Sequence, residues 1–197
     1  MLKFSVEKTD GDARAGGLSS PHGLVPTPAF MPVGTQATVK ALSPDEVSAT
    51  GARMLISNTY HLWLRPGPEI VEQHGGLHEF SRWPHAIATD SGGCQAFSLA
   101  EGGKPREDGF AFQSHLDGSR RMLSPEASMR VQGMLGSDIA MQLDVCPPAG
   151  CPRDELVSAV ERTTRWAARC LAAKRKDQAL FAIVQGGLDP ELRLRHA

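Results

Sequence analysis

The sequence has few of the features that mark secreted, disulfide-stapled or membrane-spanning proteins. Only four of its 197 residues are cysteines, at positions 94, 146, 151 and 170. Their spacing matches neither a zinc knuckle nor the disulfide framework of a small secreted domain, so reduced thiols in a cytoplasm are expected. No stretch of about 18 uninterrupted apolar residues occurs, which predicts no membrane span. The first residues, MLKFSVEKTDGDARAG, are too polar for a signal peptide.

An excess of charge of either sign is lacking too. The chain has 21 Lys and Arg against 22 Asp and Glu, for a net charge of -1. No overall field therefore attracts nucleic acid, although a local basic patch stays possible. An apolar fraction of 41% in a chain of this length suits one globular unit with a sizeable core.

Five short apolar runs are typical of buried strands: TPAFMPVGT, RMLISNTY, AIATDSGG, DIAMQLDV and ALFAIVQGG. The first 25 residues instead predict short strands and turns, with turn signals at Asp10-Gly11 and His22-Gly23. Another hairpin is predicted around Asp117-Gly118, because Asp-Gly favours a tight hairpin turn.

Helical patterns separate the apolar runs. Ser43 with Glu46 three residues later forms a capping box, which predicts a helix that ends at Gly51. The clearest helical repeat is that of Leu156, Val160, Thr163, Ala167, Cys170 and Leu171. Further helices are predicted to begin near Pro68, Ser124 and Asp189. This alternation implies an α/β fold with parallel strands, either as an open doubly wound sheet or as a barrel.

Unusual polar residues follow three of the predicted strands: Asp90-Ser91-Gly92-Gly93, Asp144 and Gln185-Gly186-Gly187. In both layouts the chemistry gathers at the C-terminal ends of the strands, so the three groups are expected to face one mouth. Carboxylates accept paired hydrogen bonds, whereas an amide and exposed N–H groups donate to a carbonyl. Guanine offers the complement, N–H donors beside a carbonyl, and a flipped-out guanine would fit such a pocket.

Other interpretations are weaker. Each of the three polar groups, taken alone, could be an ordinary turn or loop cap without a function. The run DSGG also surrounds the nucleophilic serine of chymotrypsin-like proteases, with Ser91 as nucleophile and a histidine such as His61 as base. Those proteases are all-β, which argues against them here. Gly75-Gly76 breaks any common helix face of His74 and His78, so no metal site is predicted in this chain.

Two groups of arginines could touch phosphates. One is the pair Arg120-Arg121, and the other is Arg162, Arg165 and Arg169 on the clearest helix. Solvated helix charges explain the second group better. No phosphate-binding loop of the GxxxxGK type is present.

The same residues carry a resemblance to a known family. The segments TPAFMPVGTQATVKAL, SNTYHLWLRPG, GGLHEF, TDSGG, SHLDGSRRMLSPE, LGSDIAMQLDVC and LFAIVQGG resemble tRNA-guanine transglycosylases in order and spacing, over nearly the whole chain. The resemblance implies an incomplete (β/α)8 TIM barrel with a short N-terminal β segment, in which residues 1–197 form the N-terminal part of one transglycosylase domain. The C-terminal strands and a zinc subdomain are then expected to be missing.

The resemblance further implies exchange of guanine at the tRNA wobble position for a 7-deazaguanine, preQ1 or queuine, in queuosine biosynthesis. The implied mechanism is a double displacement at the ribose anomeric carbon. Asp90 resembles the family's proton acceptor. Ser91, Gly92 and Gly93 resemble the backbone that lines the base, and Asp144 and Gln185 resemble the groups that read its edge. The implied partners are tRNA with a GUN anticodon and a second copy of the chain, in the cytoplasm and without a membrane.

The sequence departs from the family in four respects. The nucleophilic aspartate and the zinc ligands normally lie further along, so this chain is expected to be inactive alone and to hold no zinc. Cys94 stands where the family usually has an aromatic that stacks on the base. Val145 stands where many bacterial members have glutamate, which leaves preQ1 and queuine both open. A non-catalytic tRNA-binding partner subunit is the alternative, and retention of Asp90, Asp144 and Gln185 argues against it.

Overall fold

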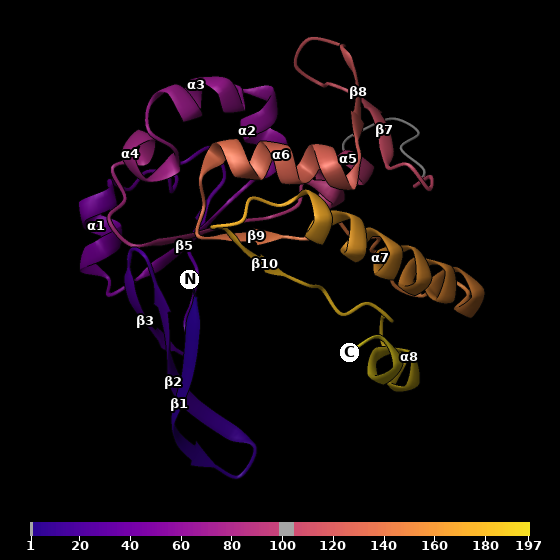
Figure 1. Cartoon of the computed structure of the whole chain (residues 1–197), viewed down its shortest axis with the longest axis horizontal. Coiled ribbons are helices and arrows are strands. Elements are labelled where there is room, and N and C mark those ends of the chain that lie inside the picture. Colours follow the sequence, from indigo (N-terminus) through magenta and orange to yellow (C-terminus); the bar gives the residue numbers. More distant parts are fainter. Residues whose placement is uncertain (1, 99–104) are drawn as a thin grey trace.

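The N-terminal residues form a small antiparallel sheet. The computed structural model describes residues 2–98 and 105–197, and its first strands are β1 (Lys3–Asp10), β2 (Ala13–Ser20) and β3 (Gly23–Thr27), in the order β1-β2-β3. The predicted turns after Asp10 and before Gly23 are present. Figure 1 shows this sheet projecting away from the rest of the fold.

A five-stranded parallel sheet forms the centre of the molecule. Its order is β10-β9-β6-β5-β4, with every neighbouring pair parallel. A doubly wound sheet reverses its strand order at a switch point, and this order runs without reversal, so the doubly wound layout is wrong. Residues 2–98 and 105–197 form an open sheet and no closed barrel. The strands are β4 (Val33–Gly34), β5 (Met54–Ser57), β6 (Ala86–Thr89), β9 (Ile139–Met141) and β10 (Ala179–Phe181).

Helices connect the parallel strands as predicted. They are α1 (Pro44–Ala49), α2 (Thr59–Leu64), α3 (Pro68–Gln73), α4 (Leu77–Ser81), α5 (Gly93–Ser98), α6 (Pro125–Leu135), α7 (Arg153–Ala173) and α8 (Pro190–His196). The capping box of Ser43 and Glu46 is confirmed. Helices α2, α4 and α5 were not predicted, because one or two turns are too short for a helical period to appear. Figure 1 shows α2, α3, α4 and α6 on one face of the sheet.

The core lies between the sheet and these helices. One cluster includes Leu62, Leu77, Trp83, Ile87 and Leu135, and another joins Phe110, Leu143 and Trp166. Helix α7 buries a slightly different face from the predicted one: Trp166 is fully buried, whereas Leu171 is 62% exposed. No helix in the described part of the chain is long and apolar enough to cross a membrane.

The predicted hairpin around Asp117-Gly118 is confirmed. Strands β7 (Phe110–Gln113) and β8 (Arg120–Leu123) pair antiparallel, and Gly118 adopts a φ of 71° in the loop between them. Phe110, Phe112 and Leu123 are buried, which fixes the hairpin to the core. Figure 1 shows it beside α5, near the C-terminal ends of the parallel strands.

Candidate base-binding site

The three predicted polar groups meet at the C-terminal edge of the sheet. Gln185 Nε2 donates to Asp144 Oδ2 at 2.6 Å, and Ser91 Oγ donates to Asp144 Oδ1 at 3.4 Å. The expectation that the three groups lie close together is therefore confirmed. A cavity of about 260 Å³ opens there, lined by Ile56, Asp90, Ser91, Gly92, Cys94, Gln95, Met141, Asp144 and Ile183.

Asp90 is held by donors from the end of β5 as well as from its own loop. Its Oδ1 accepts the backbone N–H groups of Thr59 at 2.9 Å and Gly92 at 3.2 Å, and its Oδ2 accepts Asn58 Nδ2. The sequence interpretation gave Asn58 and Thr59 no role. The signal was present, since this polar pair follows a buried apolar strand in the same way as Asp90 does.

Burial raises the pKa of Asp90 to about 6. The N–H groups of Thr59 and Gly92 oppose this effect, and the nearby charge of Asp144 adds to it. A carboxyl group with a pKa near 6 is mostly ionised at neutral pH and still basic enough to take up a proton efficiently. The surroundings of Asp90 therefore suit a proton acceptor.

Asp144 is partly buried. Its burial raises its pKa, while the hydrogen bonds from Gln185 and Ser91 work against this. Gln185 and Asp144 are paired with each other, so neither points freely into the cavity. An ionised carboxylate has about four acceptor positions, two of which these donors occupy. Asp144 can consequently still accept hydrogen bonds from a ligand.

The glycines after Asp90 are also packed closely against the protein itself. Gly92 has a φ of 79°, and a Cβ there would lie 3.1 Å from Tyr60 N. A Cβ on Gly93 would lie 2.9 Å from Leu143 Cδ1. Their N–H groups donate to Asp90 Oδ1 and Ser91 Oγ rather than standing free. The positive φ and the nearby Tyr60 backbone thus favour glycine at position 92, and at position 93 a side chain would require Leu143 to shift.

Cys94 is exposed in the first turn of α5. It lines the 260 Å³ cavity and also an adjoining one of about 130 Å³, together with Cys146 and Phe97. Val145 is buried in the core, and its N–H donates to Thr163 Oγ1 at 3.0 Å. The small thiol leaves room beside the cavity that a larger ring could fill.

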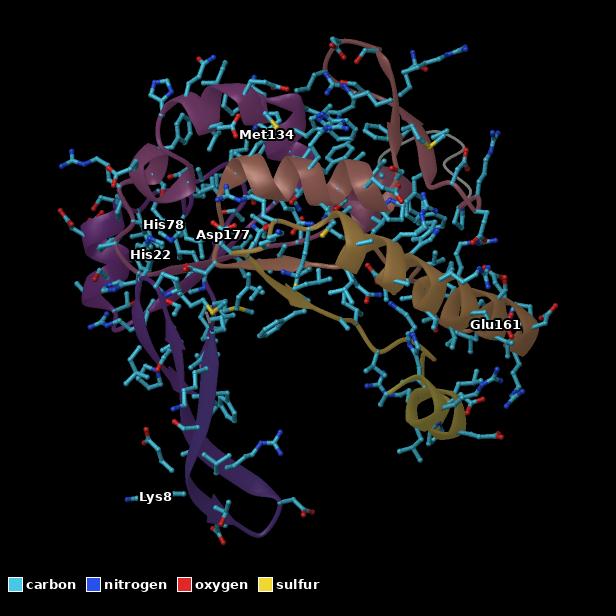
Figure 2. The ribbon with its side chains drawn as sticks, viewed as in Figure 1. Lys8, His22, His78, Met134, Glu161 and Asp177 are labelled. Atoms are coloured by element: carbon cyan, nitrogen blue, oxygen red, sulfur yellow. The ribbon has the colours of Figure 1, made fainter. Side chains whose placement is uncertain are left out.

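The opposite edge of the sheet carries a further carboxylate, Asp138, which is buried. Asp138 accepts His22 Nδ1 at 2.7 Å, His78 Nε2 at 3.2 Å and Ile87 N at 2.9 Å. Burial raises the pKa of Asp138, but the hydrogen bonds from His78, His22 and Ile87 outweigh it and the net pKa is lowered. Figure 2 shows His22 and His78 side by side at this edge.

The arrangement of these two histidines does not fit a metal ion. In the described residues they and Asp138 form the single group of three histidine, cysteine or acidic side chains close enough to share an ion. Their rings are stacked, with centroids 3.5 Å apart and planes 15° apart. A coordinating nitrogen directs its lone pair within the ring plane, and two parallel planes 3.5 Å apart cannot both contain one ion. His74 bonds Ile70 O instead, separate from His78.

Comparison with models of protein families identifies the family of this chain. The model described as queuine tRNA-ribosyltransferase matches residues 9–197. The chain belongs to this family.

Curated relatives support the assignment. A queuine tRNA-ribosyltransferase from Sorangium cellulosum is 66% identical over 196 residues, covering 100% of this chain and 50% of the relative. Those from Pelotomaculum thermopropionicum and Desulforamulus reducens are 58% and 53% identical over 199 residues, covering all of this chain and 54% of each relative. The chain therefore spans about half the length of the curated relatives it matches.

The two groups of arginines differ in the structure. On α7, Arg162 and Arg165 bond Glu107, and Arg169 bonds Glu126. Arg120 is exposed and makes no side-chain hydrogen bond or ion pair with the residues the structure describes. The helix arginines are thus engaged within the protein. In the hairpin, Arg121 bonds Ser119 Oγ and Trp63 O, whereas Arg120 stays available among the described residues.

Proposed function

We propose that the protein exchanges guanine at the wobble position of tRNA for a 7-deazaguanine, and that this chain supplies the base-binding half of the site. One observation carries the proposal: Asp90 and Asp144, from two strand ends, line one cavity, Gln185 from a third strand end bonds Asp144, and burial raises the pKa of Asp90 to about 6. Membership of the queuine tRNA-ribosyltransferase family supports the substrate class.

The roles follow from the chemistry of each group. Asp144 accepts the N–H donors of the purine edge, and the Gln185 amide, which orients Asp144, contributes a further polar contact. In a double displacement, an enzyme carboxylate first displaces guanine from the anomeric carbon, and the incoming base then displaces the carboxylate. The incoming base loses a proton as its nitrogen attacks, and Asp90 takes that proton. We assign the nucleophile to no residue of this chain.

The wider context belongs to the same proposal. The ordered parallel sheet would form part of a (β/α)8 barrel. The partners would be tRNA with a GUN anticodon, preQ1 or queuine, and a second copy of the protein, in the cytoplasm. The described residues offer no fitting ligand set for a structural zinc. Their one group of three possible ligands is His22, His78 and Asp138, and the two histidine rings in it are stacked.

Incorporation of labelled guanine into tRNA tests the proposal. The full-length protein is expected to exchange free labelled guanine into tRNA that has guanine at the wobble position, and to leave tRNA with another base there unlabelled. Asp90→Ala should abolish exchange while leaving the circular dichroism spectrum unchanged. Full exchange by a folded Asp90→Ala variant would contradict the role of Asp90. A folded wild-type protein that exchanges nothing would point to a non-catalytic partner subunit.

A further inference from the structure

The β7–β8 hairpin is connected directly to the elements that hold Asp90. Tyr60 follows Asn58 and Thr59, the two residues that donate to Asp90. The Tyr60 hydroxyl bonds His115 Nδ1 at 3.0 Å, and the two rings stack with centroids 5.7 Å apart and planes 12° apart. The loop of the hairpin is thereby placed next to the candidate base-binding site.

His115 offers a ring for stacking. Tyr60 is fully buried, whereas His115 is exposed, so its ring lies on Tyr60 while the side chain still faces solvent. The His61 ring meets it at an angle of 77° with centroids 6.1 Å apart. A supported aromatic ring of this kind can stack an unpaired base without sequence preference, because every base has a π face.

Cationic side chains accompany this ring. The Arg121 guanidinium lies over the Trp63 ring at 5.2 Å and bonds Ser119 Oγ and Trp63 O. Arg120 is exposed on the opposite face of β8, without a side-chain partner in residues 2–98 and 105–197. Asp117 is the carboxylate of this loop, and it accepts the Ser119 N–H and hydroxyl within the loop.

The hairpin is also anchored to the hydrophobic core. Phe112 pairs across the strands with Arg121 and is buried against Tyr60, with centroids 5.2 Å apart. Phe110 packs on Trp166, which is fully buried. A surface fixed in this way loses little conformational entropy when a ligand binds.

We propose that His61, His115, Arg120 and Arg121 form an RNA platform that binds unpaired nucleotides next to the exchanged base. His115 stacks a base, and Arg120 and Arg121 contact phosphates. The inference rests on the proposed function and deepens it, since it assigns the flanking nucleotides to one surface. Unpaired RNA fits better than a duplex, because an A-form helix keeps its base faces stacked inside.

Two pairs of variants separate stacking from charge. His115→Ala and His115→Phe both lose the bond to Tyr60, but only His115→Phe keeps a ring. Arg120→Gln removes an arginine without side-chain partners in the described structure, and Arg14→Gln removes an exposed arginine in the N-terminal sheet. The probe is an RNA hairpin whose unpaired loop contains guanine, and binding to the full-length protein is measured over a range of salt concentrations.

Wild type is expected to bind this RNA more tightly than a duplex of the same stem. His115→Ala should weaken binding at least about fivefold without changing the salt slope, and His115→Phe should restore most of it. Arg120→Gln should reduce the slope of log K against log salt by about 0.7, the effect of one lost phosphate contact. Arg14→Gln should leave both quantities at wild-type values.

The outcomes distinguish the two proposals. If wild type binds the RNA but His115→Ala and Arg120→Gln match it in affinity and salt slope, the RNA platform is wrong and the proposed function stands. If wild type does not prefer the unpaired RNA to the duplex, both are contradicted. Equal loss in His115→Ala and His115→Phe would mean that the bond to Tyr60 matters rather than stacking, which also overturns the platform.

Discussion

The two edges of the parallel sheet hold buried aspartates in opposite electrostatic surroundings. At the N-terminal edge, Asp138 accepts three donors, and its pKa is lowered. At the C-terminal edge, Asp90 also accepts three donors, yet burial and the charge of Asp144 raise its pKa to about 6. Desolvation raises the pKa of both carboxyl groups, so burial alone does not explain why the two net shifts are opposite.

The difference lies in which charges surround each carboxylate. Two histidines, which can carry positive charge, contact Asp138, whereas a second carboxylate lies near Asp90. The first arrangement favours an ionised carboxylate. It joins the turn between β2 and β3, helix α4 and the residue that precedes β9. The second keeps a carboxyl group poised to exchange a proton. In barrels of parallel strands, the N-terminal edge commonly serves stability and the C-terminal edge serves chemistry.

The largest expected effect on stability is at Asp138. Asp138→Ala should lower the free energy of unfolding by about 3 kcal/mol or more, because it leaves the donors of Ile87 and His78 buried without an acceptor. Urea denaturation measures this value. The matched control is Asp177→Ala, an exposed aspartate at the same edge (Figure 2), which should change stability little. If Asp138→Ala unfolds with nearly the free energy of wild type, Asp138 does not stabilise this edge of the sheet.

At the other edge, the ionised Asp90 should reduce stability. Its folded pKa of about 6 exceeds the ordinary value of 3.8, so the folded state binds a proton more tightly. The resulting stabilisation is full below about pH 4 and is lost as the pH rises through about 6.

Asp90→Asn, which cannot ionise, should therefore gain about 2 kcal/mol of stability relative to wild type between pH 4 and pH 7. Chemical denaturation of both proteins across this range measures the difference. A pH-independent difference would show that Asp90 does not titrate as described.

The smallest effect concerns Cys94. Cys94→Phe should tighten binding of free guanine by about 1–3 kcal/mol if the new ring fills the room beside the cavity and stacks on the base. Calorimetric titration with guanine measures this change, and Cys151→Phe, at a thiol outside the 260 Å³ cavity, is the control. Unchanged or weaker binding by Cys94→Phe would mean that another residue stacks the base.

The sequence predicted the C-terminal edge much better than the N-terminal one. Asp90, Asp144 and Gln185 directly follow apolar runs, and the ends of parallel strands must meet. Asn58 and Thr59 carry the same signal and could have been found. The contacts of Asp138 could not, since His22 and His78 lie 116 and 60 residues away along the chain. Nor could the packing reason for Gly92 and Gly93, which depends on Tyr60 and Leu143.

A titration of the side-chain carboxyl groups by ¹³C NMR tests the contrast between the two edges most directly. Selective labelling and the variants Asp90→Asn and Asp138→Asn assign the two signals in wild type. The structure predicts that Asp90 titrates near pH 6, whereas Asp138 titrates below the ordinary range of an aspartate. If both carboxyl groups titrate together near pH 4, or if Asp138 has the higher pKa, the assignment of chemistry to one edge and stability to the other is contradicted.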